Sequence, residues 1–569
     1  MSGVGEIELQ VMWNRLIAVV EEQAQVLLRT AFSSIVREAG DLSTGVFDPK
    51  GRMLAQAVTG TPGHVNSMAL AVPHFIERFP LETMKEGDIY ITNDPWLATG
   101  HLNDFTVVTP AFHQGKLVGL FACTSHLMDI GGLGCGPDAT DVFMEGLYVP
   151  HLKLAEAGKM NETLLAMIRA NTRLPIDSIG DVYSLAACND IGCKHLGKMM
   201  DEFSLDDLER LGNHIYERSR VAVLAELTKL PKGSWRNAMI IDGYNEALTL
   251  AATVTVTEAG IDVDYTGTSL AVGRGINVPL CYTTAYTVYP LACIVAASIP
   301  NNTGSLSPFT VSAPEGSLLN APRRKPVSGR HNIGHMLPDV VLGCLRQAMP
   351  ERIPAEGASG LWLLNFRGEL PGGQNNMFST AVSTNGGQGA RPMKDGLTAT
   401  GFPSGVKATP IEIAEAITPL VFWKKELRPD SGGPGKHRGG LGQTIEIARN
   451  DNLPFEFLAM VERIHNPARG SAGGMSGASG YVGLKSGKTL KGKGAQIIPA
   501  GDRLVVLTPG GGGIGDPVTR ERSVVERDVA EGYVSVDAAD KTYGSSGASE
   551  VRGTRLSGSS SAELSSTSL

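Results

Sequence analysis

Two stretches determine how the first part of this chain folds: Asn93-Asp94-Pro95-Trp96-Leu97-Ala98-Thr99-Gly100-His101-Leu102-Asn103-Asp104 and Thr124-Ser125-His126-Leu127-Met128-Asp129. Both combine histidine with acidic residues, and each borders an apolar segment. Imidazole and carboxylate groups are ligands that suit divalent transition metals. The pattern therefore indicates a metal site, provided that the fold brings the two stretches together.

The residues between the two stretches predict a β-hairpin. Residues 105–112 are rich in β-branched and aromatic side chains, and residues 117–123 form a second apolar run. Residues 113–116 between them carry a tight-turn signal. The two runs are therefore expected to pair as antiparallel strands.

The register of this hairpin depends on the length of its loop. If the loop is Gln114-Gly115, Asp104 faces Ser125, whereas a loop that also includes Lys116 places Asp104 opposite His126. Opposed residues on such a ladder have Cβ atoms only ~5 Å apart. Either register therefore brings His126 beside Asp104.

Two imidazoles and one carboxylate are predicted to converge at this end of the hairpin. His101 lies on the turn that enters the first strand, near Asp104 and His126, and this set suits zinc, manganese or iron. Asp41, just past a long amphipathic helix, is available as a fourth ligand. The alternative is that His101 and Asp104 belong to a solvated turn, because such spacings are common in polar loops.

Composition limits the possible functions. The chain has 569 residues, which exceeds one ordinary core, so two or three domains are expected. The formal net charge is -8 with acidic and basic residues interspersed, so binding to nucleic acid or to an anionic membrane surface is disfavoured.

The sequence predicts a soluble, cytoplasmic protein. Seven scattered cysteines fit reduced thiols better than a disulfide framework. The first residues lack the basic and apolar regions of a secretory signal. The most membrane-like run, residues 282–299, contains Pro290 and several polar side chains, so a buried helix is expected there.

Hydrophobic periodicity predicts an α+β fold with several domains. One long helix is expected over residues 6–38, further helices over 67–79, 161–229, 284–297 and 332–348, and antiparallel strands over 233–267. The expected divisions are an N-terminal metal-site region (1–230), a mixed strand and helix region (231–350), a glycine-rich β region (351–543) and a disordered tail (544–569).

Two glycine-rich segments imitate functional motifs. Residues 510–515 contain G-x-G-x-x-G after a strand, but too little chain follows to build the βαβ unit that a dinucleotide site requires. Residues 428–440 resemble a basic patch, although their glycine and proline content favours a structural turn or a subunit contact. No G-x-x-x-x-G-K-[ST] motif occurs, so the chain shows no phosphate loop of its own.

Motifs along nearly the whole chain resemble the hydantoinase B/oxoprolinase family. They are residues 93–104, 129–132, 142–150, 169–173, 264–269, 428–433 and 508–517. The resemblance implies that Asp41, His101, Asp104 and His126 bind one divalent metal, with zinc favoured over manganese or iron. Many members have Gly-Gly-Thr-His-Leu-Pro-Asp where this chain has Ala98-Thr99-Gly100-His101-Leu102-Asn103-Asp104, a departure that keeps the ligands.

The resemblance also implies a partner. Family members act with a hydantoinase A-type ATPase subunit, which binds ATP and Mg and activates the substrate by phosphorylation. This chain would then be one subunit of a heterotetramer that opens a cyclic amide, as hydantoinases, lactamases and 5-oxoprolinases do. The variant at Trp96 and at Gly100-His101 resembles the lactamase side of the family.

Three further residues are expected around the metal. They are His64, Asp129 as a partner that orients an imidazole, and Glu145 as an acid or base. For each, a purely structural polar role is the alternative. Three other functions also stay open: a subunit of an ATP-dependent ketone carboxylase, a non-enzymatic scaffold subunit, and a non-haem iron oxygenase.

Overall fold

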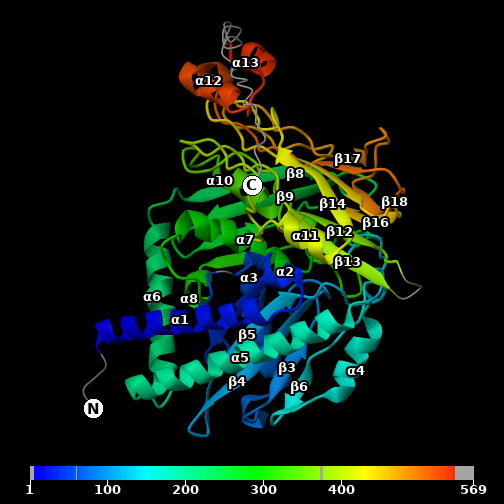
Figure 1. Ribbon diagram of the computed structural model, residues 1–569. Helices are drawn as coiled ribbons and strands as arrows, with labels where there is room; N and C mark the ends of the chain where they lie inside the picture. Colours follow the sequence, from blue (N-terminus) through cyan, green and yellow to red (C-terminus); the bar gives the residue numbers. More distant parts are fainter. Residues whose placement is uncertain (1–4, 59, 372–375, 545–569) are drawn as a thin grey trace, which may run out of the picture.

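The computed structural model describes residues 5–58, 60–371 and 376–544. In Figure 1 the N-terminal part lies at the bottom in blue and cyan, the middle part is green, and the glycine-rich part lies above in yellow and orange. Helices and, within the described residues, four sheets form the predicted α+β fold. The predicted disordered tail lies outside the described residues from residue 545 onward.

The first helix, α1 (Glu6–Thr30), ends earlier than predicted. Its apolar residues recur at helical spacing and are buried, and it contains no proline. The helix stops because Asp181 Oδ1 accepts hydrogen bonds from the backbone N–H groups of Phe32 and Ser33, at 2.7 and 3.2 Å. A tertiary contact therefore overrides the local helical pattern. The other helices of this part are α2 (Ser34–Arg37), α3 (Pro62–Arg78), α4 (Glu162–Asn171), α5 (Pro175–Phe203) and α6 (Glu209–Leu227).

A seven-stranded antiparallel sheet forms the centre of the N-terminal part, in the order β2-β1-β5-β4-β3-β6-β7. In Figure 1, α1 and α5 cross one face of this sheet. Its hairpin of β4 and β5 is the one that the sequence predicts. The strands are β1 (Leu42–Phe47), β2 (Met53–Gln56), β3 (Ile89–Thr92), β4 (Asp104–His113), β5 (Lys116–His126), β6 (Leu152–Glu156) and β7 (Lys159–Met160), with short 3-10 turns η1 (Leu81–Thr83) and η2 (Val142–Met144).

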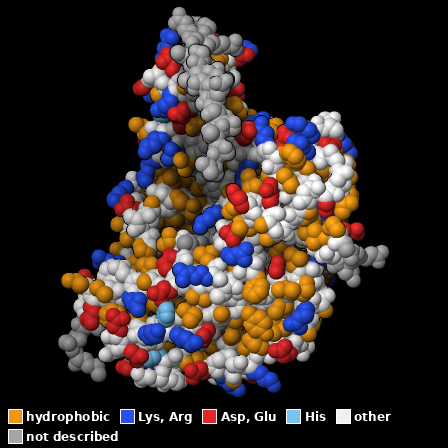
Figure 2. Space-filling model, viewed as in Figure 1, with side chains coloured by type: hydrophobic (Ala, Val, Ile, Leu, Met, Phe, Trp, Pro, Cys, Tyr) orange, Lys and Arg blue, Asp and Glu red, His pale blue; other side chains and the backbone are white. Residues whose placement is uncertain are grey.

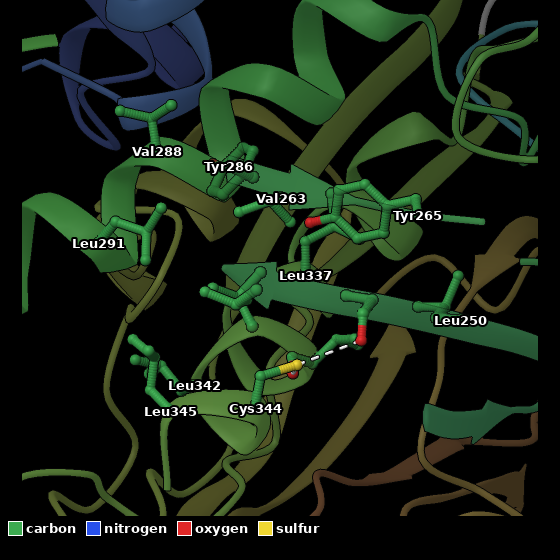
Figure 3. Close-up of a cluster of buried hydrophobic side chains, with 14 of the residues drawn as sticks. Leu250, Val263, Tyr265, Tyr286, Val288, Leu291, Leu337, Leu342, Cys344 and Leu345 are labelled. Carbon is green, nitrogen blue, oxygen red and sulfur yellow. Dashed lines mark hydrogen bonds between the residues drawn. The ribbon is translucent and has the colours of Figure 1, made fainter. Parts of the chain in front are cut away.

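The middle part is a four-stranded sheet covered by helices. Its strands β8, β9 and β10 are antiparallel as predicted, and β11 pairs parallel with β10. Figure 3 shows side chains of α7 and α10 packed against this sheet, with Cys344 Sγ donating to the Ala252 carbonyl at 3.3 Å. The elements are β8 (Gly233–Ile241), β9 (Leu248–Val256), β10 (Ile261–Asp264), β11 (Phe309–Ser312), α7 (Leu280–Val295), α8 (Thr303–Leu306), α9 (Arg330–Gly334) and α10 (Leu337–Leu345).

The C-terminal part contains two four-stranded antiparallel sheets, in the orders β13-β12-β16-β18 and β14-β15-β19-β17. Two helices that the sequence did not predict, α12 and α13, project at the upper end of the molecule in Figure 1. The elements are β12 (Trp362–Glu369), β13 (Met377–Thr384), β14 (Leu420–Leu427), β15 (Gln443–Arg449), β16 (Phe455–Met460), β17 (Tyr481–Leu484), β18 (Lys493–Ile498), β19 (Leu504–Leu507), α11 (Ile411–Ile417), η3 (Pro517–Thr519), α12 (Arg522–Ala530) and α13 (Val536–Tyr543).

Glycine-rich segments pack directly against one another in this part. A Cβ atom on Gly511 would lie 2.0 Å from the Gln388 carbonyl oxygen, and one on Gly513 would lie 2.2 Å from the Pro434 oxygen. Backbone hydrogen bonds join the segments, including Gly433 N to Gly511 O at 2.7 Å. The G-x-G-x-x-G motif therefore serves backbone packing. We call these segments, residues 386–389, 432–440, 470–477 and 509–515, the glycine layer.

The distribution of surface charge and the state of the cysteines match what the composition predicted. On the face shown in Figure 2, acidic and basic side chains are interspersed. All seven cysteines are free thiols. Among the described residues, no helix is both long enough and apolar enough to span a bilayer.

Candidate metal centre

The hairpin places Asp104 directly opposite His126. The turn Gln114-Gly115 has positive φ at both residues, 50° and 78°, as a tight two-residue hairpin loop requires. A β-bulge between Ala111 and Phe112, where β5 contributes one extra residue, then shifts the pairing by one. The loop is therefore Gln114-Gly115, the shorter of the two that were considered. Asp104 nevertheless faces His126, as was expected for the longer loop.

His101 is oriented by the backbone. The carbonyl oxygen of Ser328 accepts a hydrogen bond from His101 Nδ1 at 3.0 Å, so the lone pair of the neutral ring lies on Nε2. This Nε2 is 2.6 Å from Asp104 Oδ1. Burial, with the nearby Arg330 cation, lowers the pKa of His101 to about 4, so the ring is neutral near pH 7.

These three residues could together hold a metal ion. Asp104 Oδ1 lies 2.6 Å from His101 Nε2, whose lone pair faces it, and 3.1 Å from His126 Nδ1, so one carboxylate oxygen and two imidazole nitrogens converge. The three ligand atoms all lie within 4.8 Å of one another, and the three residues are buried. His101, Asp104 and His126 therefore form a possible metal-binding triad.

Arg330 balances the charge of the site. Its Nη2 contacts Asp104 Oδ2, its Nε donates to the Thr99 carbonyl at 2.7 Å, and its guanidinium lies 3.9 Å from the Tyr282 ring centre. Burial alone would raise the pKa of Asp104, but the charges of His64 and Arg330 hold it well below its usual range. Asp104 is therefore ionised and available as a ligand.

Asp41 and His64 lie on the same pocket wall. His64 Nε2 is 2.9 Å from Asp104 Oδ2, and His64 Nδ1 is 3.6 Å from Asp41 Oδ1, so the imidazole stands between two carboxylates. Burial opposes its protonation, yet Asp104 and Asp41 raise the pKa of His64. Asp41 also accepts a hydrogen bond from Thr61 Oγ1 at 3.1 Å, and it lines the pocket without joining the triad.

Glu145 lies behind the site. Its Oε1 accepts hydrogen bonds from the backbone N–H groups of Val327 and Ser328, both at 2.7 Å, and Ser328 is the residue whose carbonyl orients His101. Its Oε2 is buried and has no hydrogen-bond partner among the described residues. Burial raises the pKa of Glu145 to about 8.

Asp129 is occupied elsewhere. Its Oδ1 accepts from Arg173 Nη1 at 2.6 Å and its Oδ2 contacts the backbone N–H of Arg173. No contact between Asp129 and an imidazole occurs within the described part of the chain. The expected orienting role is instead performed for His101 by Ser328.

The opposite wall of the pocket comes from residues that sequence reasoning did not identify. Tyr282 and Tyr286 on α7, with Arg330, His331 and His335 on and after α9, face the triad across a cavity of about 30 Å³. His331 is buried, and its Nε2 has no hydrogen-bond partner among the described residues. The sequence feature that could have identified Arg330 and His331 is the polar run at residues 328–332, which directly precedes an apolar helix.

Comparison with known proteins gives one family. The Hydantoinase B/oxoprolinase profile matches residues 5–517. A putative D-/L-hydantoinase subunit of Pseudomonas sp. (strain NS671) is 27% identical, with 96% of this chain and 95% of that protein covered. A 5-oxoprolinase of Dictyostelium discoideum is 28% identical, with 90% of this chain but 40% of that protein covered.

Two solved structures share the fold. The crystal structure of the ATP-dependent caprolactamase from Pseudomonas jessenii superposes with a TM-score of 0.86 at 26% identity, covering 95% of this chain and 96% of that one. A nucleotide-free acetone carboxylase structure superposes with a TM-score of 0.83 at 20% identity, covering 94% and 79%, and shows likeness of fold alone.

Proposed function

The chain belongs to the hydantoinase B/oxoprolinase family, and on that premise we propose that it is the metal-containing subunit of an ATP-dependent cyclic amide hydrolase. The buried triad of His101, Asp104 and His126 carries this proposal, because it offers a metal site inside a chain that matches hydantoinase and caprolactamase subunits over nearly its full length. The substrate class is a lactam, a hydantoin or a related ring.

The partner is a hydantoinase A-type ATPase subunit that binds ATP and Mg, in a heterotetramer. The name of the caprolactamase relative describes a subunit of an enzyme, and the 5-oxoprolinase relative is a single chain of which this one covers 40%. A separate ATPase subunit would supply what the longer chain carries in its remaining length. The complex is proposed to act in the cytoplasm, where seven free thiols stay reduced.

Zinc, or alternatively manganese or iron, would be held by His101, Asp104 and His126, with Asp41 as the fourth ligand. Such an ion polarises a carbonyl group or supplies a water-derived nucleophile. The protein contributes the geometry: Ser328 orients the His101 ring, and Arg330 keeps Asp104 ionised.

The residues without a ligand role divide into two groups. His64 and His331 line the pocket, so they are the candidates for moving a proton or for hydrogen-bonding a substrate oxygen. Glu145 and Asp129 contact backbone and Arg173 instead, which supports positioning roles. Glu145 as acid or base remains a proposal that substitution tests directly.

The main alternative is an ATP-dependent ketone carboxylase, because acetone carboxylase has the same fold. The two functions differ in products. Chain and ATPase subunit together should be supplied with ATP and, side by side, with lactams, hydantoins, 5-oxoproline and simple ketones, while ADP and organic products are measured. Ring-opened product supports the hydrolase. Turnover with ketones alone, with labelled bicarbonate entering a carbon–carbon bond, would replace it by the carboxylase.

A further inference from the structure

A second cavity adjoins the metal pocket. It has a volume of about 470 Å³ and lies between α3 and α7, within the range of small-molecule sites. Apolar side chains such as Val65, Tyr289 and Ala292 form much of its wall, together with the carboxamides of Gln56 and Asn301. None of the described residues that line it carries a charge.

The same two helices form both the metal pocket and the cavity. Along α7, Tyr282 and Tyr286 line the metal pocket, whereas Tyr289 and Cys293 line the cavity. These positions are spaced by four, three and four residues, so they form one stripe along the helix. Seven residues separate Tyr286 from Cys293, a rise of ~10 Å.

Helix α3 provides the second shared wall. His64 faces the metal pocket, while its neighbours Pro62 and Val65 line the cavity. The α3 backbone at Gly63 approaches α7 closely, since a Cβ there would lie 2.5 Å from the Tyr286 ring. One turn of each helix therefore separates the two spaces.

The carboxamides leave one donor and one acceptor free. Asn301 Nδ2 donates to Gln56 Oε1 at 3.0 Å and to Asn66 Oδ1 at 2.9 Å, and Asn66 Nδ2 donates to the Ala285 carbonyl at 3.3 Å. Gln56 Nε2 and Asn301 Oδ1 are paired with no other group among the residues that the structure describes, and neither is a buried unpaired atom, so both are open to solvent. A ligand with a matching acceptor and donor can therefore replace water at these two atoms.

We propose that this cavity, at the wall that it shares with the metal pocket, binds the uncharged cyclic amide substrate. The inference rests on the proposed function and names its substrate class. A small ring holds its amide cis, so C=O and N–H lie on one edge and match the free donor of Gln56 and acceptor of Asn301. A ketone lacks the N–H, and a carboxylate-bearing ring such as 5-oxoproline would bring a charge that no cation in the cavity offsets.

Cys293 provides a direct binding assay. It is exposed and lines the cavity, whereas Cys193 is a half-buried thiol on α5 and serves as an internal control. Desolvation by the neighbouring side chains raises the pKa of the accessible Cys293 thiol, so labelling with methyl methanethiosulfonate is carried out at alkaline pH. Modification of each cysteine is followed by peptide mass spectrometry in the complex with the ATPase subunit.

ε-Caprolactam and hydantoin should slow the modification of Cys293 saturably, whereas acetone and 5-oxoproline should not slow it. None of the four compounds should change the modification rate of Cys193. Ala297→Trp fills the exposed mouth of the cavity, and Ala259→Trp on a surface turn is its matched control. Ala297→Trp should raise KM for caprolactam about tenfold or more with kcat nearly unchanged, equivalent to ~1.4 kcal/mol of binding.

Different results would refute the cavity proposal and the proposed hydrolase function. If the complex opens lactams but Cys293 is unprotected and Ala297→Trp leaves KM unchanged, the cavity proposal is wrong and the proposed function stands. If the rings protect Cys293 but are never opened with ATP present, the cavity binds them and the proposed hydrolase function is wrong.

Discussion

Replacement of Glu145 by Gln tests the structure behind the metal site. Gln keeps an oxygen for the N–H groups of Val327 and Ser328, and so should keep the turn that orients His101. It removes the ionisable carboxyl, whose pKa burial raises to about 8 from an ordinary value of 4.5. The substitution therefore separates the charge of this residue from its shape.

The expected effect is a change in how stability depends on pH. Below about pH 4.5, the pKa of Glu145 in the unfolded chain, the carboxyl is protonated in both the folded and the unfolded state, so it does not make stability depend on pH. Between about 4.5 and about 8 the unfolded chain releases the proton while the folded chain retains it, so the free energy of unfolding falls as pH rises. At ~1.4 kcal/mol per pH unit, the full loss above pH 8 is about 4 to 5 kcal/mol.

Urea unfolding of parent and Glu145→Gln chains from pH 5 to pH 8 measures this difference. Across that interval the free energy of unfolding of the variant should rise relative to that of the parent by about 3 to 4 kcal/mol, because the glutamine has no proton to release on unfolding. A difference independent of pH would refute the raised pKa. With the ATPase subunit present, kcat should remain close to that of the parent; a fall of about a hundredfold with metal retained would establish Glu145 as the acid or base.

Four further outcomes are expected. His101→Ala or His126→Ala should lose most of the metal found by elemental analysis, whereas His113→Ala at the hairpin tip should keep it, and equal loss in all three would indicate fold damage. His331→Gln should lower kcat by about a hundredfold with metal retained, because its buried Nε2 lines the pocket without a partner among the described residues; loss of metal would make His331 a ligand. The chain without its ATPase subunit should neither hydrolyse ATP nor open lactams, and ATPase activity in the pure chain would overturn the two-subunit proposal. Gly511→Ala should lower the melting temperature sharply, because its Cβ would lie 2.0 Å from a carbonyl oxygen, whereas Gly360→Ala, with open space at that position, should melt like the parent.

The hairpin and its three convergent side chains were predictable because their signals are local. Runs of β-branched and aromatic residues, a turn motif and short sequence separations place His101, Asp104 and His126 together. The register was left open because the bulge between Ala111 and Phe112 was not located, although Pro110 beside it is a residue that sheets tolerate at bulges. Bulges add a residue without changing composition, so hydrophobic patterning alone does not locate them.

The rest of the site depended on contacts between distant residues. Arg330 and His331 reach the triad from more than two hundred residues away in the sequence, across a packing of α7 and α9 that no local period encodes. The end of α1 was missed for the same reason, since Asp181 captures the backbone at Phe32 and Ser33. Glu145 was singled out for its chemistry, and only the fold reveals that its partners are backbone groups.

The glycine layer has a consequence for the dynamics of the chain. Its segments are neither helices nor strands, and irregular backbone of that kind ordinarily exchanges its amide hydrogens with solvent first. Here the amides of Gly433, Gly511 and Gly513 bond to carbonyls of neighbouring segments with no side chains between them. Opening one segment breaks bonds to several others, so the layer opens as one cooperative unit. Its amides should therefore exchange as slowly as those of the surrounding sheets.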